Sequence, residues 1–112
     1  MSTPLDKQGL QESSTNFDLE NVRPFLQRIS PLIESGFGDV QIEQVCQLAQ
    51  RMEIDATEEL RFPIRFAGKD TFICISIFMD DIESPDIYFF SPPALAAQID
   101  AEMQKFFEEL GI

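Results

Sequence analysis

The chain has no histidine and no tryptophan, and only two of its 112 residues are cysteine. Histidine is the side chain that most often serves as a general base or a metal ligand near neutral pH. Its absence excludes Ser-His and Cys-His catalysis and histidine-ligated metal centres. The sequence also lacks a glycine-rich phosphate loop, a nucleophile elbow and a Cys-x-x-Cys pair. We therefore expect a protein that is not an enzyme and needs no cofactor.

Long apolar runs are missing too. None approaches the roughly 20 residues that a membrane-spanning helix needs, and the first residues show neither the basic nor the apolar region of a signal peptide. Cys46 and Cys74 lie within apolar patterns, which predicts two buried, reduced thiols. These features predict a cytoplasmic protein with no membrane partner.

Acid is what the sequence has in excess. Twenty Asp and Glu residues face eight Lys and Arg residues, which gives a net charge of −12. From Thr71 onward there are eight carboxylates and a single base, Lys105. Such a surface repels the phosphates of nucleic acids and anionic lipids, and it attracts basic proteins and divalent cations. We expect no nucleic-acid partner, although the acidity also serves to keep a small protein soluble.

The N-terminal part of the chain is polar, and its few apolar residues show no periodic spacing. Residues 1–16 contain two isolated leucines, so we expect a flexible tail ahead of a single α+β domain over residues 17–112. Apolar residues at helical spacing predict a first helix over about residues 19–35. Pro31 cannot donate the backbone hydrogen bond that a continuous helix needs, which predicts a kink or break near Ser30.

Two more helices are expected. One runs from the capping residue Asp39 to about Met52, although residues 40–45 also fit a short strand. The other is C-terminal, with Ser91 as its cap and Pro92 at its first helical position. The two helices ahead of the strands and this one after them indicate an α+β fold.

Three strands are predicted between the second and third helices, over about residues 60–66, 71–79 and 86–90. The first alternates apolar and polar residues, and Pro63 within it favours an edge position. The second is apolar on nearly every residue, which is typical of a central strand. A tight turn over residues 67–70 joins these two. We expect a three-stranded antiparallel meander with the middle strand at its centre.

An acidic loop separates the last two strands. Clustered carboxylates in a turn favour hard cations such as Ca²⁺. The loop lacks the glycine and the distal glutamate of an EF-hand, so a Ca²⁺ site here is an alternative hypothesis. Its candidate ligands are Asp80, Asp81, Glu83 and Asp86.

Aromatic residues on the predicted strands form a second candidate site. If the helices pack on one face of the sheet, the other face exposes an apolar patch suited to a partner or a homodimer. If the kinked first helix covers that face, the residues are buried within the monomer, which is the outcome we favour. The residues are Phe72, Phe78, Tyr88 and Phe90.

The outer face of the C-terminal helix is the third candidate. Charged residues opposite an apolar stripe are usual on a surface helix, but here the sign is one-sided. With the acidic loop they would form one negative field that attracts a basic partner. The residues are Asp100, Glu102, Glu108 and Glu109.

These features favour a non-enzymatic protein-binding module, such as an adaptor, an inhibitor or a chaperone-like protein, with a partner whose surface is basic or mixed. Two alternatives stay open, a Ca²⁺-binding protein and a mimic of nucleic-acid charge. Both the main hypothesis and the Ca²⁺ alternative require the carboxylates to cluster in space.

Overall fold

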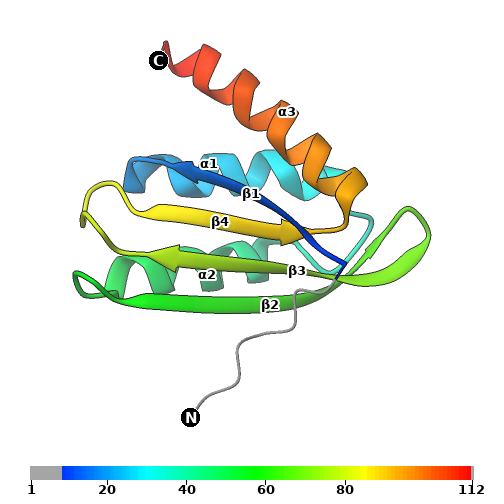
Figure 1. Ribbon diagram of the computed structural model, residues 1–112, viewed down its shortest axis with the longest axis horizontal. Helices are drawn as coiled ribbons and strands as arrows, with labels where there is room; N and C mark the ends of the chain where they lie inside the picture. Colours follow the sequence, from blue (N-terminus) through cyan, green and yellow to red (C-terminus); the bar gives the residue numbers. More distant parts are fainter. Residues whose placement is uncertain (1–8, 112) are drawn as a thin grey trace.

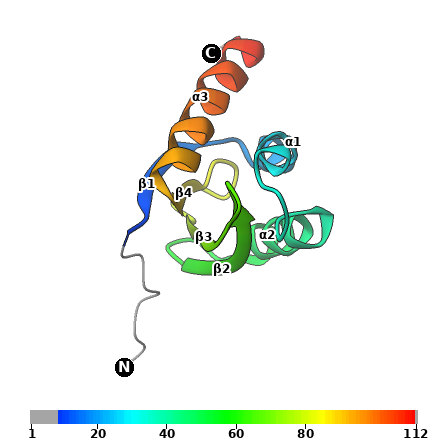
Figure 2. The ribbon, with the colours of Figure 1, turned by 90° about the vertical axis from the view of Figure 1, so that its right-hand side faces the viewer.

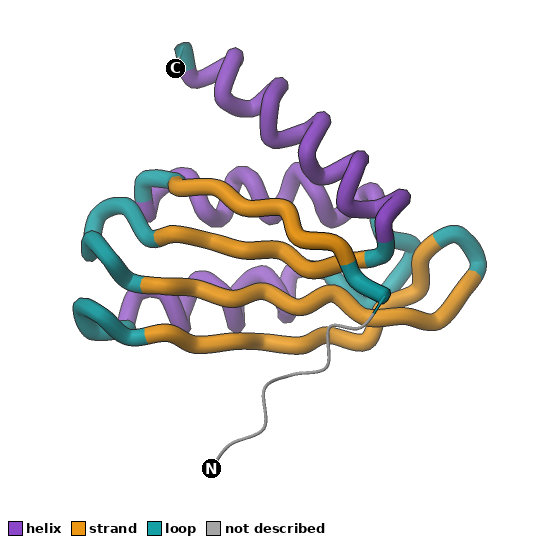
Figure 3. Tube along the Cα trace, in the orientation of Figure 1, coloured by secondary structure: helices purple, strands orange, loops and turns teal. Residues whose placement is uncertain are grey.

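A computed structural model describes residues 9–111 as a four-stranded sheet with three α-helices (Figures 1 and 3). The elements in chain order are β1 (Gln11–Asn16), α1 (Leu19–Ile29), the 3-10 turn η1 (Ser30–Leu32), α2 (Asp39–Arg51), β2 (Thr57–Phe66), β3 (Lys69–Phe78), β4 (Asp86–Ser91) and α3 (Pro93–Leu110). The strand order is β1-β4-β3-β2, and each neighbouring pair is antiparallel. The predicted α+β class is confirmed.

The prediction of three strands is wrong, because β1 adds a fourth strand beside β4. The predicted tail over residues 1–16 is therefore wrong for Gln11–Asn16, while residues 1–8 lie outside the described residues. β1 has no apolar alternation, and its place comes from backbone pairing with β4. Ser13 is buried on its inner side and donates its hydroxyl to the carbonyl of Ala96 at 3.3 Å. Polar residues thus form a strand here because a neighbouring strand and helix satisfy them.

The predicted break near Ser30 is confirmed. α1 ends at Ile29, and a 3-10 turn over Ser30–Leu32 follows it, so the helix is shorter than the expected 19–35. Pro31 lies within this turn, where its missing N–H ends the regular hydrogen-bond pattern.

Helix α2 includes residues 40–45, which on sequence alone fitted a helix or a strand. Its N-cap is Gly38 rather than the expected Asp39, and the Gly38 N–H donates to Gln41 Oε1 at 2.9 Å. Ser91 does not cap α3 as predicted: it is the last residue of β4 and is fully buried. Pairing with Gln11 of β1 extends β4 to this residue, so α3 begins at Pro93.

The predicted positions of the remaining strands are confirmed. β2, which contains Pro63, is an edge strand, and β3 is an interior strand. The turn is tighter than expected, with only Ala67 and Gly68 unpaired at φ of 52° and 75°. Pairing between β2 and β3 consequently begins beside the turn, with Phe66 opposite Lys69, and continues to the first residue of β2.

Helices α1 and α2 lie against one face of the sheet, and α3 packs along α1 and β1 (Figures 1 and 2). Phe25 of α1 is at the centre of this core, with its ring 4.8 Å from Phe17, 5.8 Å from Phe89 and 5.5 Å from Phe106. The buried side of the sheet is apolar, as the strand alternation predicts. Its buried apolar residues are Phe62, Ile64, Phe66, Ile73, Ile75, Ile77, Ile87 and Phe89.

The two cysteines are both buried, as predicted, and form no disulfide with each other. Within residues 9–111, no helix is both long enough and apolar enough to cross a bilayer.

Candidate functional site

Three connecting segments meet at one end of the sheet, on the left in Figure 1: the β1–α1 junction, the α2–β2 connection and the β3–β4 loop. We call residues 16–20, 51–58 and 79–86 the loop end. Antiparallel pairing brings them together, because the end of β1 lies beside the start of β4 and the end of β3 beside the start of β2.

Hydrogen bonds fix the β3–β4 loop against the start of α1. The Leu19 N–H donates to the Glu83 carbonyl at 2.6 Å, and the Ser84 hydroxyl donates to Asp18 Oδ1 at 2.9 Å. The Asn16 amide donates to the Ser84 carbonyl at 2.7 Å. These bonds satisfy backbone groups that helix and strand ends leave open, and they join the two segments into one surface.

The α2–β2 connection is held to the same surface. The Asp55 N–H donates to the Met79 carbonyl, and the Met79 N–H donates to the Ala56 carbonyl, both at 2.9 Å. Asp55 has a φ of 69°, a left-handed conformation that aspartate tolerates better than most residues. The three segments are thus joined by backbone contacts.

The loop end carries nine carboxylates and one base, Arg51, which makes its net charge −8 of the chain's −12. All nine except Asp86 are exposed, and no ion pair between described residues includes any of them. The nine are Asp18, Glu20, Glu53, Asp55, Glu58, Asp80, Asp81, Glu83 and Asp86. Exposed like charges repel one another over a screening length of about 8 Å in physiological salt.

Two exposed aliphatic side chains lie among these carboxylates. Ile82 is 57% exposed and Ile54 is 47% exposed. A groove of about 550 Å³ opens beside Ile82, between the start of α1, the end of α2 and the β3–β4 loop. Its lining residues are Asp18, Leu19, Glu20, Gln50, Ile82 and Glu83.

The predicted Ca²⁺ ligands Asp80, Asp81, Glu83 and Asp86 lie in or beside this loop, but two of the carboxylates already accept hydrogen bonds. Asp81 Oδ1 accepts from the Glu83 N–H at 2.8 Å, and Asp86 Oδ1 accepts from the Asn16 amide at 2.9 Å. In the described part of the chain, no three His, Cys, Asp or Glu side chains gather so as to hold a metal ion. Ca²⁺ binding stays a prediction.

The predicted aromatic residues Phe72, Phe78, Tyr88 and Phe90 lie on the sheet face opposite the core. The expectation that α1 buries them is wrong, because α1 and α2 pack on the other face (Figure 2). Phe72 is 38% exposed, with the Arg61 guanidinium 3.8 Å from its ring centre, and the other three are half-buried.

The predicted acidic face of α3 is partly neutralised within the chain. Arg28 of α1 donates from Nε to Glu102 at 2.7 Å and also forms an ion pair with Glu109. The hydrogen bond from Arg28 lowers the pKa of Glu102 below the ordinary glutamate value. Asp100 and Glu108 are exposed. This face therefore offers less net charge to a partner than the sequence suggests.

The sequence reasoning missed the contributions of the first two segments, including Asp18, Glu20, Ile54 and Glu58. A signal for part of this set existed: in any β2–β3 hairpin, the residues before β2 lie beside those after β3, which places Glu53 to Glu58 next to the acidic loop. The residues at the start of α1 had no such signal, because their position depends on β1.

Comparison with known proteins found no family model, curated protein or solved structure that matches this chain. The features of this chain that bear on function are the geometry and charge of the loop end.

Proposed function

We propose that this protein is a non-enzymatic binding module whose loop end contacts a basic surface of a partner protein, as adaptors, inhibitors and chaperones do. The observation that carries the proposal is the gathering of nine carboxylates from three segments against one arginine. A surface with one sign of charge steers an oppositely charged partner and raises the rate of association.

The contacts within the loop end support this assignment. Backbone hydrogen bonds such as Leu19 to Glu83 hold the segments in place, so the carboxylates are presented on a rigid surface. Their side chains form no ion pair with described residues that would neutralise them. Because like charges oppose folding, a basic partner that neutralises them would also stabilise the folded state.

Affinity capture from a lysate of the source organism tests the proposal, with bound proteins identified after washes at low and moderate salt. Two variants that lose the same number of charges are compared with the wild type. The loop-end variant carries Glu53→Gln, Glu58→Gln and Asp80→Asn. The control variant carries Glu12→Gln, Asp100→Asn and Glu108→Gln, at exposed positions elsewhere.

We expect wild type and control to retain a stoichiometric partner at low salt, and the loop-end variant, with about a hundredfold drop in affinity, to lose about nine-tenths of it. Moderate salt should release the partner from the wild type, because exposed charge contacts are screened. Equal retention by all three proteins would contradict the proposal and assign the contact to another surface, such as the aromatic sheet face.

A further inference from the structure

The groove of the loop end continues into a second hollow between α1 and α2. The first hollow measures about 550 Å³ and the second about 260 Å³, and both are lined by Leu19, Glu20 and Gln50. The first lies within the range of about 300–1,000 Å³ that ligand pockets span. Together they form a continuous depression from Ile82 to the second turn of α1.

The inner part of this depression has an apolar wall beside the polar residues Glu20, Arg23 and Gln50. Its wall includes the buried residues Val22 and Cys46 and the half-buried Leu19. Burial raises the pKa of the Cys46 thiol, which keeps this group neutral. Ile82 is on the rim, more than half exposed in a loop that is otherwise largely polar. An aliphatic side chain from a partner would find apolar contacts on both sides here.

The charge around the depression is graded. Asp18 and Glu83 lie at its outer end, Glu20 borders both hollows, and all three are exposed. Arg23 lines the inner end, where its Nη2 is 2.6 Å from Glu43 Oε2, so this cation is already paired. The carboxylates are therefore most numerous at the outer end, which favours cations there.

The depression is also held in shape. The bonds from Leu19 to Glu83 and from Ser84 to Asp18 join its two outer walls. A preformed site loses little conformational entropy on binding.

We propose, resting on the protein-binding function above, that this depression seats a basic amphipathic segment of the partner. An aliphatic side chain of the segment packs between Leu19 and Ile82, and its flanking lysines or arginines lie against Asp18, Glu20 and Glu83. The apolar contacts of the depression match an aliphatic side chain, and its carboxylates match the flanking bases. A purely basic peptide would leave the apolar contacts unused, and a purely apolar peptide would leave the carboxylates unpaired.

A synthetic peptide tests the inference directly. The probe is fluorescein-labelled Lys-Lys-Leu-Ala-Lys-Leu-Lys-Lys, and its control has serine in place of both leucines. Binding is measured by fluorescence anisotropy at about 50 mM and about 200 mM salt, so that screening is varied across the physiological range. The protein variants are Ile82→Ser and, as a matched control, Val40→Ser, an exposed aliphatic residue at the far end of α2.

We expect Ile82→Ser to weaken binding of the leucine peptide about tenfold, the effect of losing part of one aliphatic contact. Val40→Ser should leave binding unchanged. The serine peptide should bind weakly and equally to all three proteins, because only its charges remain. Circular dichroism spectra of the variants confirm that each is folded, which exposed substitutions in a loop and a first helical turn permit.

Equal binding of the leucine peptide to the wild type and Ile82→Ser would overturn the inference. So would equal affinity of the leucine and serine peptides for the wild type. Either result leaves the proposed function standing if the captured partner still depends on the loop-end carboxylates. Loss of that dependence in the capture experiment, with the peptide result as expected, would instead contradict the proposed function and leave the groove as a binding site.

Discussion

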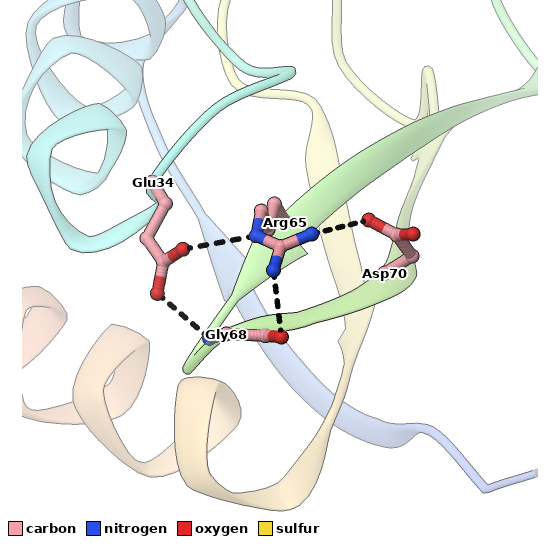
Figure 4. A network of polar contacts seen from close by, with 4 residues as sticks. All are labelled: Glu34, Arg65, Gly68 and Asp70. Atoms are coloured by element: carbon pink, nitrogen blue, oxygen red, sulfur yellow. Dashed lines mark hydrogen bonds and ion pairs between the residues drawn. The ribbon is translucent and has the colours of Figure 1, made fainter.

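The hairpin end of the sheet, formed by residues 33–38 and 63–72, carries two acids and two bases, whereas the loop end carries nine acids and one base. Three of the four charged side chains at the hairpin end form a connected network with Gly68 (Figure 4). They are Glu34, Arg65 and Asp70. Arg65 lies 3.5 Å from Glu34 and 3.3 Å from Asp70, and it donates to the Gly68 carbonyl at 3.0 Å. Glu34 in turn accepts from the Gly68 N–H at 2.8 Å. Charge here holds the turn against the α1–α2 connection.

The contrast indicates what each set of charges contributes. At the hairpin end, exposed ion pairs add a small stabilisation, about 0.2–1 kcal/mol for each pair. At the loop end, no ion pair between described residues includes any of the nine carboxylates, and their mutual repulsion opposes folding. Paired charge thus serves the fold, and unpaired charge is available to an external partner.

Among substitutions at the hairpin end, we expect the largest loss of stability at Gly36. A β-carbon at this position would lie 2.3 Å from the Pro63 carbonyl oxygen, and the residue has a φ of 95°. Gly36→Ala should therefore lower the free energy of unfolding by about 3 kcal/mol or more, from backbone strain and overpacking combined. Urea denaturation followed by circular dichroism measures the change.

Gly68→Ala is the matched control for this substitution. Gly68 also has a positive φ, 75°, but a β-carbon there meets no atom within 4 Å. Its cost should be about 1 kcal/mol, that of a left-handed conformation alone. Similar costs at the two glycines would show that the close approach to Pro63 is not what requires Gly36.

Removing charged groups should change the stability of the protein in opposite directions at the two ends of the sheet. Arg65→Gln removes the cation shared by two carboxylates and should destabilise by about 1 kcal/mol. The double variant Glu53→Gln and Asp80→Asn relieves repulsion at the loop end and should stabilise by about 0.5 kcal/mol at low salt. Urea denaturation at low and high salt measures both, and both effects should shrink with salt. Destabilisation by the double variant would mean that the loop end carries structural charge pairs after all.

Much of the fold was readable from sequence where the cause is local. Pro31 ended α1, Pro63 marked an edge strand, and Gly68 marked the turn, because each acts through its own backbone geometry. β1 was missed because its residues are polar, including the buried Ser13, whose hydroxyl donates to the Ala96 carbonyl. That strand is specified by the neighbours it pairs with.

In the candidate site, too, the residues that are close in sequence were predicted and those brought in by strand pairing were not. The four carboxylates of residues 80–86 lie within one short loop and were recognised as a cluster from sequence. Asp18 and Glu20 lie beside them because β1 pairs with β4, so missing β1 meant missing these residues. The aromatic face was assigned to internal burial for a related reason: sequence periodicity identifies two apolar faces of a strand but does not say which face the helices cover.

The contact between α1 and α3 is a third region, and its charges are paired as at the hairpin end. Hydrogen bonding to Arg28 holds the pKa of Glu102 below its ordinary value near 4.5. A carboxyl group with a lower pKa in the folded state adds stability above its unfolded pKa and loses it as pH falls through its folded pKa. The wild type should therefore be more stable than Glu102→Gln by a constant amount above pH 4.5, and the difference should shrink below it.

Denaturation of both proteins across this pH range gives the difference directly. In an Arg28→Met background, Glu102→Gln should change the acid limb of the stability curve much less, because the group that lowers the pKa most is absent and only Lys105, 3.6 Å from Glu102, still lowers it. A pH-dependent difference of undiminished size in that background would assign the effect to Lys105 instead of Arg28.

The smallest expected effect distinguishes general screening of the loop end from a specific Ca²⁺ site. A divalent cation near nine carboxylates lowers their repulsion whatever its coordination geometry, so Ca²⁺ and Mg²⁺ at about 2 mM should raise the thermal midpoint equally, by about 1–2 °C. Asp81 Oδ1, a candidate ligand, already accepts the Glu83 N–H. Melts in Ca²⁺, Mg²⁺ and EDTA test this. A rise with Ca²⁺ alone, abolished by Asp81→Asn and unaffected by Asp100→Asn, would establish the Ca²⁺ site instead, because only coordination depends on one carboxylate and one ion radius.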